Sequence, residues 1–314
     1  MLVGLVNMPS TLIVAIRLWT AAVCLGAVLL VQRWRSGRAV GDVRAGDRAG
    51  VGSGTGSLDT ARSAVSAPRP MSVYPMRCVV TAVTLGAHWL ALFAAYQRAP
   101  AGTVILIVYM APLGVAALAP RFLGEPLGRG TVVALAAAVA GFGLLAGPTV
   151  QSAGAAGLLL SLVAMVLFVF LILLSKPLAA VYGGLRLAFL ELAGAGVVLI
   201  PVALATAWPS PRPAWLWIMV LGVVHTALGI SLYLSVLARV PATHVGIISY
   251  LEPVVVVLAA WVWLGQRPAL VTVVGGSLVV AAGVSIALSG SGPSGRPRRV
   301  GAVVGSVDPV VPAP

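Results

Sequence analysis

The chain has 314 residues, of which 60% are hydrophobic and 9% are charged, and it carries a formal net charge of +13. This composition, with a mean hydropathy of +1.07, excludes an ordinary soluble domain and predicts an all-α helix bundle that crosses a membrane many times. The arginines gather in the loops between apolar segments, where membrane topology explains them. We therefore expect the partner of this basic chain to be a lipid bilayer and not a nucleic acid.

Nine segments are apolar over about the 17 to 25 residues that a helix needs to cross a bilayer. The first lies within residues 1–31, and the predicted fold is a polytopic membrane bundle of about nine transmembrane helices. The segments are found near residues 10–31, 78–96, 102–120, 131–147, 156–175, 187–207, 214–238, 244–264 and 269–289.

Residues 32–75 are rich in Gly, Arg, Ser and Ala, and they have almost no large apolar side chains between Trp34 and Met71. Such a segment cannot bury enough apolar surface to fold alone, so we predict a disordered basic linker in the cytoplasm. A contact of its arginines with anionic lipid is the functional alternative. Residues 291–314 have a similar composition and are predicted to be a disordered cytoplasmic tail.

The loop charges predict the orientation of the chain. If the loop after the first span is cytoplasmic, that side receives 16 Arg and Lys residues, whereas the other side receives only Arg98, Arg212 and Arg267. The positive-inside rule then places the C-terminus in the cytoplasm, and an odd number of spans places the N-terminus outside. Arg17 lies inside the first span, where it either reaches the outer interface or is paired within the bundle.

Two stretches of the chain repeat the same pattern. Because five predicted crossings separate the copies, an odd number, they should run in opposite directions across the bilayer. Inverted repeats of this kind are typical of secondary transporters, whose substrate sites lie near the midplane of the membrane. The shared residues are Arg98, Pro100, Ala101, Tyr109, Pro112, Leu123 and Gly124 in the first copy and Arg239, Pro241, Ala242, Tyr250, Pro253, Leu264 and Gly265 in the second.

The prolines of the two copies predict helix breaks at the candidate site. Pro112 and Pro253 leave the carbonyl groups four residues earlier without helical partners, so these groups are free for neighbouring helices or a substrate; a purely structural kink is the alternative. Glu252 lies about 12 Å along its helix from His244, roughly halfway through the bilayer. A carboxyl group at that depth costs about 2.5 to 3.5 kcal/mol, so Glu252 should face a polar cavity, a partner or a proton path.

Other polar residues within the predicted spans are weaker candidates. Ser249 shares a helical face with Glu252, and Tyr109 and Tyr250 occupy matching places in the two copies, where ordinary packing is the alternative. His88 ends a polar stripe on its helix, and His225 lies in the corresponding helix of the second half; both can carry protons or simply bond to neighbouring helices. Glu191 lies about one turn from the cytoplasmic end of its span and can reach the interface.

The sequence contains none of the common catalytic, phosphate-binding or metal-binding motifs. We therefore expect no enzyme activity, no catalytic residue, no metal and no cofactor. Turnover of a lipid substrate by a membrane-bound enzyme is the alternative that this absence argues against.

The run Tyr250-Leu-Glu252-Pro253, followed by an apolar helix and Leu264-Gly265, resembles the signature of EamA-type transporters in the drug/metabolite transporter superfamily. The first copy, which continues through Gly124-Glu125-Pro126, is similar to the same element in the first repeat of that family. The resemblance implies two inverted repeats of five helices, with both termini cytoplasmic and a central cavity that opens alternately to either side.

The chain departs from this pattern in two places. Residues 8–31 resemble the second helix of the family, so the first helix is missing from the sequence; we expect a start that lies upstream, a truncation, or a form with nine helices. Residues 76–148 would then complete the first repeat, and residues 155–290 would form the second. Where the first copy has Glu125, the second has Gln266-Arg267 with an insertion of one residue.

These features predict a secondary transporter in the inner membrane of a bacterium, exporting amino acids or related small polar metabolites by rocking two halves about Glu252. Proton coupling and a homodimer are left open, as is a drug-like or nucleotide-sugar substrate. The alternative is an integral-membrane subunit that does not transport, which the missing helix favours.

Overall fold

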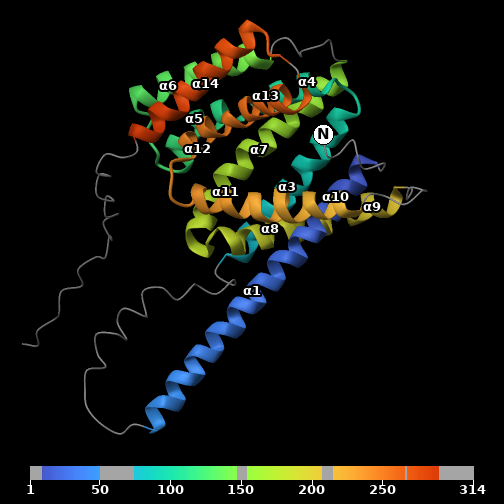
Figure 1. The fold of residues 1–314 in the computed structure, drawn as a ribbon. Helices are drawn as coiled ribbons and strands as arrows, with labels where there is room; N and C mark the ends of the chain where they lie inside the picture. The colour runs from blue at the N-terminus through green and yellow to red at the C-terminus, as the bar shows by residue number, and fades with distance from the viewer. Residues whose placement is uncertain (1–8, 50–73, 147–153, 207–214, 266, 290–314) are drawn as a thin grey trace, which may run out of the picture.

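The computed structural model describes residues 9–49, 74–146, 154–206, 215–265 and 267–289. All regular structure in these residues is helical, which confirms the all-α class (Figure 1). In the first half the helices are α1 (Ser10–Ala49), α3 (Pro75–Tyr96), α4 (Ala101–Val108), α5 (Ala111–Phe122) and α6 (Arg129–Ala146).

The second half holds nine further elements, each of which continues an apolar run of the sequence. They are α7 (Ala155–Tyr182), α8 (Gly184–Val198), α9 (Ile200–Ala205), α10 (Trp215–Val220), the π-helix η3 (Leu221–Leu228), α11 (Gly229–Leu237), α12 (Ala242–Ser249), α13 (Leu251–Leu264) and α14 (Leu270–Ser289).

Over the residues that the structure describes, every predicted span coincides with a helix or with consecutive helices. Six of these segments are long and apolar enough to cross a membrane, and α6 and α14 contain shorter apolar helices. A chain that is this apolar must satisfy its backbone polar groups internally within lipid, and a helix does so. The described part is therefore that of a multi-pass membrane protein, while the count of nine crossings and the inverted relation of the repeats remain predictions.

The first helix differs from the expectation. α1 continues through residues 32–49, where the sequence predicted a linker. No proline occurs between Pro9 and Pro68, and Ala and Arg favour a helix, so nothing in this stretch forces it to stop. The rest of the predicted linker, 50–73, and the predicted tail lie outside the described residues.

The two sequence repeats end in the same backbone conformation. Gly124 follows α5 with a φ of 65°, and Gly265 follows α13 with a φ of 66°. Left-handed φ values of this kind favour glycine because it has no Cβ. The glycine that the sequence repeats thus ends the equivalent helix in both copies.

The buried apolar side chains form two main clusters. The larger joins α1, α3, α7, α8 and α11, and the smaller joins α6, α13 and α14. Figure 1 shows α6 and α14 side by side at one end of the bundle. The helices α5 and α12 contribute to both clusters, as Val115 and Ala116 illustrate on α5. The repeated motifs therefore lie where the two clusters meet.

Candidate functional site

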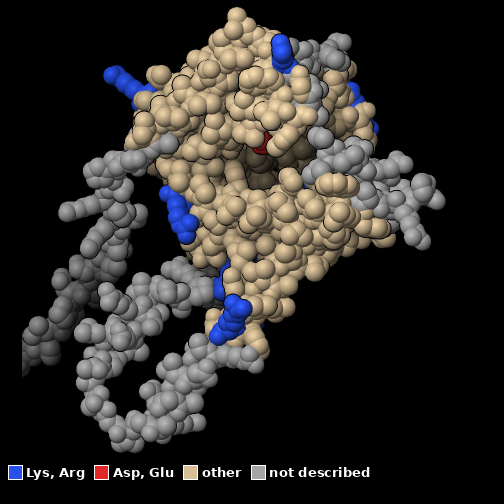
Figure 2. Space-filling model, in the orientation of Figure 1, with Lys and Arg blue, Asp and Glu red and all other residues tan. Residues whose placement is uncertain are grey.

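Two adjoining cavities lie where the two apolar clusters meet. Their volumes are about 300 Å³ and about 390 Å³, a size suited to a small-molecule ligand. Figure 2 shows the molecule hollowed on one face, with acidic atoms on the wall of the hollow. The residues that line both cavities are His88, Phe168, Ile172, Tyr233 and Glu252.

The two copies of the repeated motif contact each other at this cavity. The Tyr109 hydroxyl donates a hydrogen bond to Oε2 of Glu252 at 2.7 Å, and the Tyr250 hydroxyl donates to the backbone carbonyl of Tyr109 at 2.6 Å. Two tyrosines at matching sequence positions therefore make different bonds. Tyr109 holds the carboxylate, and Tyr250 holds the backbone of Tyr109.

Aromatic packing fixes the position of Tyr109. Its ring stacks on Phe142 with centroids 5.0 Å apart, and Tyr250 packs against both rings at 6.1 and 5.4 Å. Tyr250 is fully buried and does not line either cavity, so it supports the site from behind. The other three residues that the sequence predicted for the site of the two motifs line the smaller cavity: Tyr109, Ser249 and Glu252.

Both motif helices are broken just before their prolines. α4 ends at Val108 and α5 begins at Ala111; α12 ends at Ser249 and α13 begins at Leu251. These ends coincide with the carbonyl groups that Pro112 and Pro253 leave without helical partners. The breaks bring Tyr109 and Glu252 to the ends of short helices, where their side chains meet across the cavity wall.

The two predicted histidines lie at different places in the site. His88 is buried and lines both cavities; its Nδ1 lies 2.8 Å from the carbonyl oxygen of Ala164, and its ring stacks on Phe168. Because a carbonyl only accepts, Nδ1 carries the hydrogen in this geometry. His225 is exposed and lines only the larger cavity, at the π-helix η3.

Glu191 is buried within the bundle. It is 2% exposed and accepts a hydrogen bond of 2.6 Å from the Ser175 hydroxyl. Both residues border the larger cavity, as does Glu252. The Glu191 side chain therefore turns into the bundle between α7 and α8.

Arg17, whose surroundings the sequence left open, lies within the bundle. Its Nε and Nη2 donate to the Thr226 hydroxyl at 3.2 and 3.1 Å, and its guanidinium carbon lies 5.2 Å from the ring centre of Trp89. Both Arg17 and Trp89 line the larger cavity. A cation therefore occupies the same cavity as Glu252.

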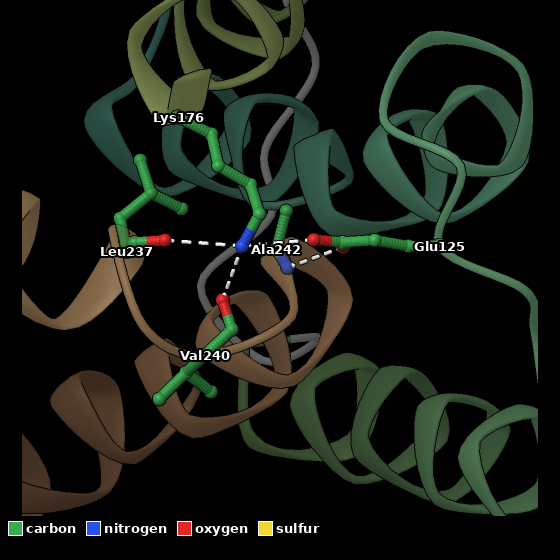
Figure 3. Close-up of polar contacts among 5 residues, drawn as sticks. All are labelled: Glu125, Lys176, Leu237, Val240 and Ala242. Carbon is green, nitrogen blue, oxygen red and sulfur yellow. Dashed lines mark hydrogen bonds and ion pairs between the residues drawn. The ribbon is translucent and has the colours of Figure 1, made fainter. Parts of the chain in front are cut away.

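A second polar network lies beyond the Ser175 end of this cavity (Figure 3). Nζ of Lys176 forms an ion pair of 2.8 Å with Oε1 of Glu125, and it also donates to the carbonyl groups of Leu237 and Val240. Oε2 of Glu125 accepts the backbone N–H of Ala242 at 2.7 Å. This network, the Lys176–Glu125 network, ties the α5–α6 turn to α7 and to the α11–α12 turn.

Sequence reasoning did not find the roles of Lys176, Glu125 or Trp89. Lys176 is the only lysine of the chain, and this is the feature of the sequence that could have pointed to it. No group of His, Cys, Asp and Glu residues able to hold a metal ion occurs within the described ranges.

The model of the EamA-like transporter family matches residues 155–288. The chain carries an EamA-like transporter domain. A probable terminal-alkyne amino-acid exporter from Streptantibioticus cattleyicolor is 29% identical over 213 residues, which are 66% of this chain and 71% of the relative. The predicted EamA-type resemblance is confirmed for residues 155–288, and the relative named as an exporter supports it.

One solved crystal structure has a similar fold over nearly the whole chain. It aligns with a TM-score of 0.66 and 19% sequence identity, covering 91% of this chain and 90% of its own. At this identity the likeness shows the fold alone.

Proposed function

We propose that this EamA-type chain is a secondary transporter of a bacterial inner membrane, which exports amino acids or related small polar metabolites by alternating access. The observation that carries the proposal is the position of Glu252. Its carboxylate lies on a membrane helix, lines both cavities and bonds to Tyr109 of the other motif copy. A charged group in such a place is costly, and it marks a substrate or proton path.

The chemistry of Glu252 suits a substrate that carries an ammonium group. A carboxylate accepts strong, short hydrogen bonds from an ammonium ion. The same oxygen atoms can instead hold a proton, so proton binding and substrate binding compete, and this competition couples their movements in opposite directions. The relative named as an amino-acid exporter supports this class of substrate.

The Lys176–Glu125 network supports alternating access. It begins next to Ser175 and Leu237, which line the larger cavity, so it closes that end of the cavity. The loop charges predict that this end is cytoplasmic. We therefore propose that the network holds the cytoplasmic end shut and must separate when the cavity opens to the cytoplasm.

Flux in proteoliposomes tests the function. The full chain is reconstituted, and uptake of labelled L-propargylglycine, an amino acid with a terminal alkyne, is measured with and without an imposed pH gradient. We expect the unmutated protein to transport it and Glu252→Gln to lose at least about tenfold in rate, since hydrogen bonds to charged groups contribute about 1.5 to 3 kcal/mol.

Two controls complete the experiment. Ser277→Ala, on the exposed side of α14, should leave the rate unchanged, and gel filtration should show that Glu252→Gln is folded. Equal rates and pH dependence for Glu252→Gln and the unmutated protein would remove Glu252 from its role. A lack of flux for every amino acid in a side-chain panel would overturn the function and favour a non-transporting subunit.

A further inference from the structure

Arg17 is a charged residue in the middle of an apolar helix surface. Its neighbours Val14, Leu18 and Ala21 are buried, and the segment Thr11–Ser36 is apolar enough to cross a membrane. Within the described residues, the one ion pair is that of Lys176 and Glu125, so no described carboxylate neutralises Arg17. Charged side chains inside membrane helices are rare because they are costly, and they mark functional sites.

Two contacts hold the guanidinium group in a fixed orientation. The Thr226 hydroxyl donates to the carbonyl of Leu221 at 2.8 Å, which leaves its lone pairs to accept from Nε and Nη2 of Arg17. The Trp89 ring lies 5.2 Å below the guanidinium carbon, a cation–π contact. Thr226 lies in the π-helix η3, and such irregular turns occur frequently at functional sites.

The remaining donors of Arg17 suit a carboxylate. Arginine has five N–H donors, of which the contact with Thr226 uses those of Nε and Nη2; Nη1 makes no hydrogen bond with any residue of the described ranges. Arg17 lines the larger cavity, so its side chain borders the space that a ligand would occupy. A planar guanidinium is well matched to the two oxygens of a carboxylate.

The larger cavity thus carries a cation and a carboxylate on the wall of about 390 Å³ of space, which is also lined by apolar side chains such as Leu85, Leu92 and Ile230. We propose that Arg17 binds the carboxylate of a zwitterionic amino acid whose ammonium group lies at Glu252. This inference rests on the proposed function and assigns its substrate class through a second, oppositely charged contact. The apolar wall would receive the side chain of the substrate.

The test compares substrates that differ only at the carboxylate. Uptake of L-propargylglycine, its primary amide and its decarboxylated amine is measured in proteoliposomes of the full chain. The unmutated protein should favour the amino acid over both analogues. Arg17→Gln should raise the KM for the amino acid about tenfold, the effect of losing one charge-assisted contact, while uptake of the amide stays the same or rises.

Three further variants keep the result interpretable. Arg17→Lys retains the positive charge but lacks the planar guanidinium group. Its KM for the amino acid should lie between that of the unmutated protein and that of Arg17→Gln. Thr226→Val removes the hydroxyl that orients the guanidinium and should raise the KM for the amino acid but not for the amide. Arg98→Gln, an exposed arginine that bonds to its own helix, is the matched control and should behave as the unmutated protein.

The outcomes separate this inference from the function on which it rests. If the unmutated protein transports the amino acid and Arg17→Gln keeps the same preference for it over the amide, the carboxylate site is overturned and the transporter stands. If Arg17→Gln lowers uptake of all three compounds equally, and phosphatidylglycerol in the vesicles changes that loss, Arg17 binds a lipid phosphate instead. If no compound moves in the unmutated protein, both proposals fail.

Discussion

Glu125 and Lys176 lie 51 positions apart in the sequence, yet their charged atoms are 2.8 Å apart, and each also holds the backbone near the start of α12. Their side chains are 19% and 16% exposed. An ion pair at such a surface contributes only about 0.2 to 1 kcal/mol by itself. The three backbone hydrogen bonds make this pair a connection between helices rather than a surface contact.

Lys176→Met should favour the conformation in which the larger cavity is open at the end that the Lys176–Glu125 network closes. It removes the ion pair and two hydrogen bonds to carbonyl groups while keeping the apolar stem. The measurement is the rate at which a membrane-impermeant maleimide labels Ile172→Cys on the wall of both cavities, in a background where Cys24 and Cys78 are replaced by alanine. We expect labelling to be about fivefold to tenfold faster, as a change of about 1 to 1.4 kcal/mol implies.

Matched variants decide whether the Lys176–Glu125 network causes this effect. Glu125→Gln should act in the same direction but less, and the double variant should be no faster than Lys176→Met, because the two residues act through one connection. Arg239→Gln removes another cation of the same region, whose side chain bonds among the described residues to its own helix, and it should change nothing. Additive effects of the two single changes would contradict the network.

Tyr109→Phe and Tyr250→Phe should have different consequences. The first change removes the donor to Glu252 on the cavity wall, so it should lower transport several-fold and leave the melting temperature nearly unchanged. The second removes a bond of a fully buried hydroxyl to the Tyr109 backbone and should lower stability by about 1 kcal/mol. Flux and thermal unfolding, measured on both proteins, check this; identical profiles would contradict the separate roles.

The helices themselves could be predicted from sequence because the signal is strong and local. Long apolar runs have one solution in lipid, and proline at positions 112 and 253 fixes where the helices break. The repeated glycine at 124 and 265 likewise predicts where α5 and α13 end. Glu252 was found because a carboxylate within an apolar run is conspicuous.

What escaped prediction depends on contacts between distant segments. The partner of Arg17 is 209 positions away, and that of Tyr109 is 143 positions away. Spacing along one helix could not show that Tyr250 points away from the cavity while Tyr109 points into it. Helix α1 passed its predicted end because the composition that marks a linker, rich in Arg and Ala, is also compatible with a helix.

Ser175→Ala should destabilise the protein through Glu191. The hydroxyl donates a bond of 2.6 Å to a carboxyl group that is 2% exposed and that also bonds to Thr81, so loss of this donor removes one of two side-chain partners of a buried acceptor, at a cost of about 1 to 3 kcal/mol. Adding Glu191→Gln should restore part of the melting temperature, because a neutral amide is less costly to bury than a carboxylate. Tryptophan fluorescence during heating measures the shift, and a double variant less stable than Ser175→Ala would contradict this account.

Gly141→Ala should push α6 and α14 apart. A Cβ at this position would lie 2.6 Å from the carbonyl oxygen of Gly275 and 2.9 Å from Cβ of Leu278, so the α14 backbone itself is the obstacle. Close approach of this kind is how small residues pack membrane helices. Overpacking costs about 1 to 3 kcal/mol, and we expect a lower melting temperature in detergent.

Gly143→Ala is the matched control for this packing. It lies on the same helix two residues later, and a Cβ there would meet nothing within 4 Å. Alanine favours a helix over glycine by about 0.5 to 1 kcal/mol, so this variant should be as stable as the unmutated protein or more so. Because both changes add the same methyl group to the same helix, a difference between their melting temperatures measures the α6–α14 contact alone. Equal destabilisation by both would show that α6 does not depend on close packing at Gly141.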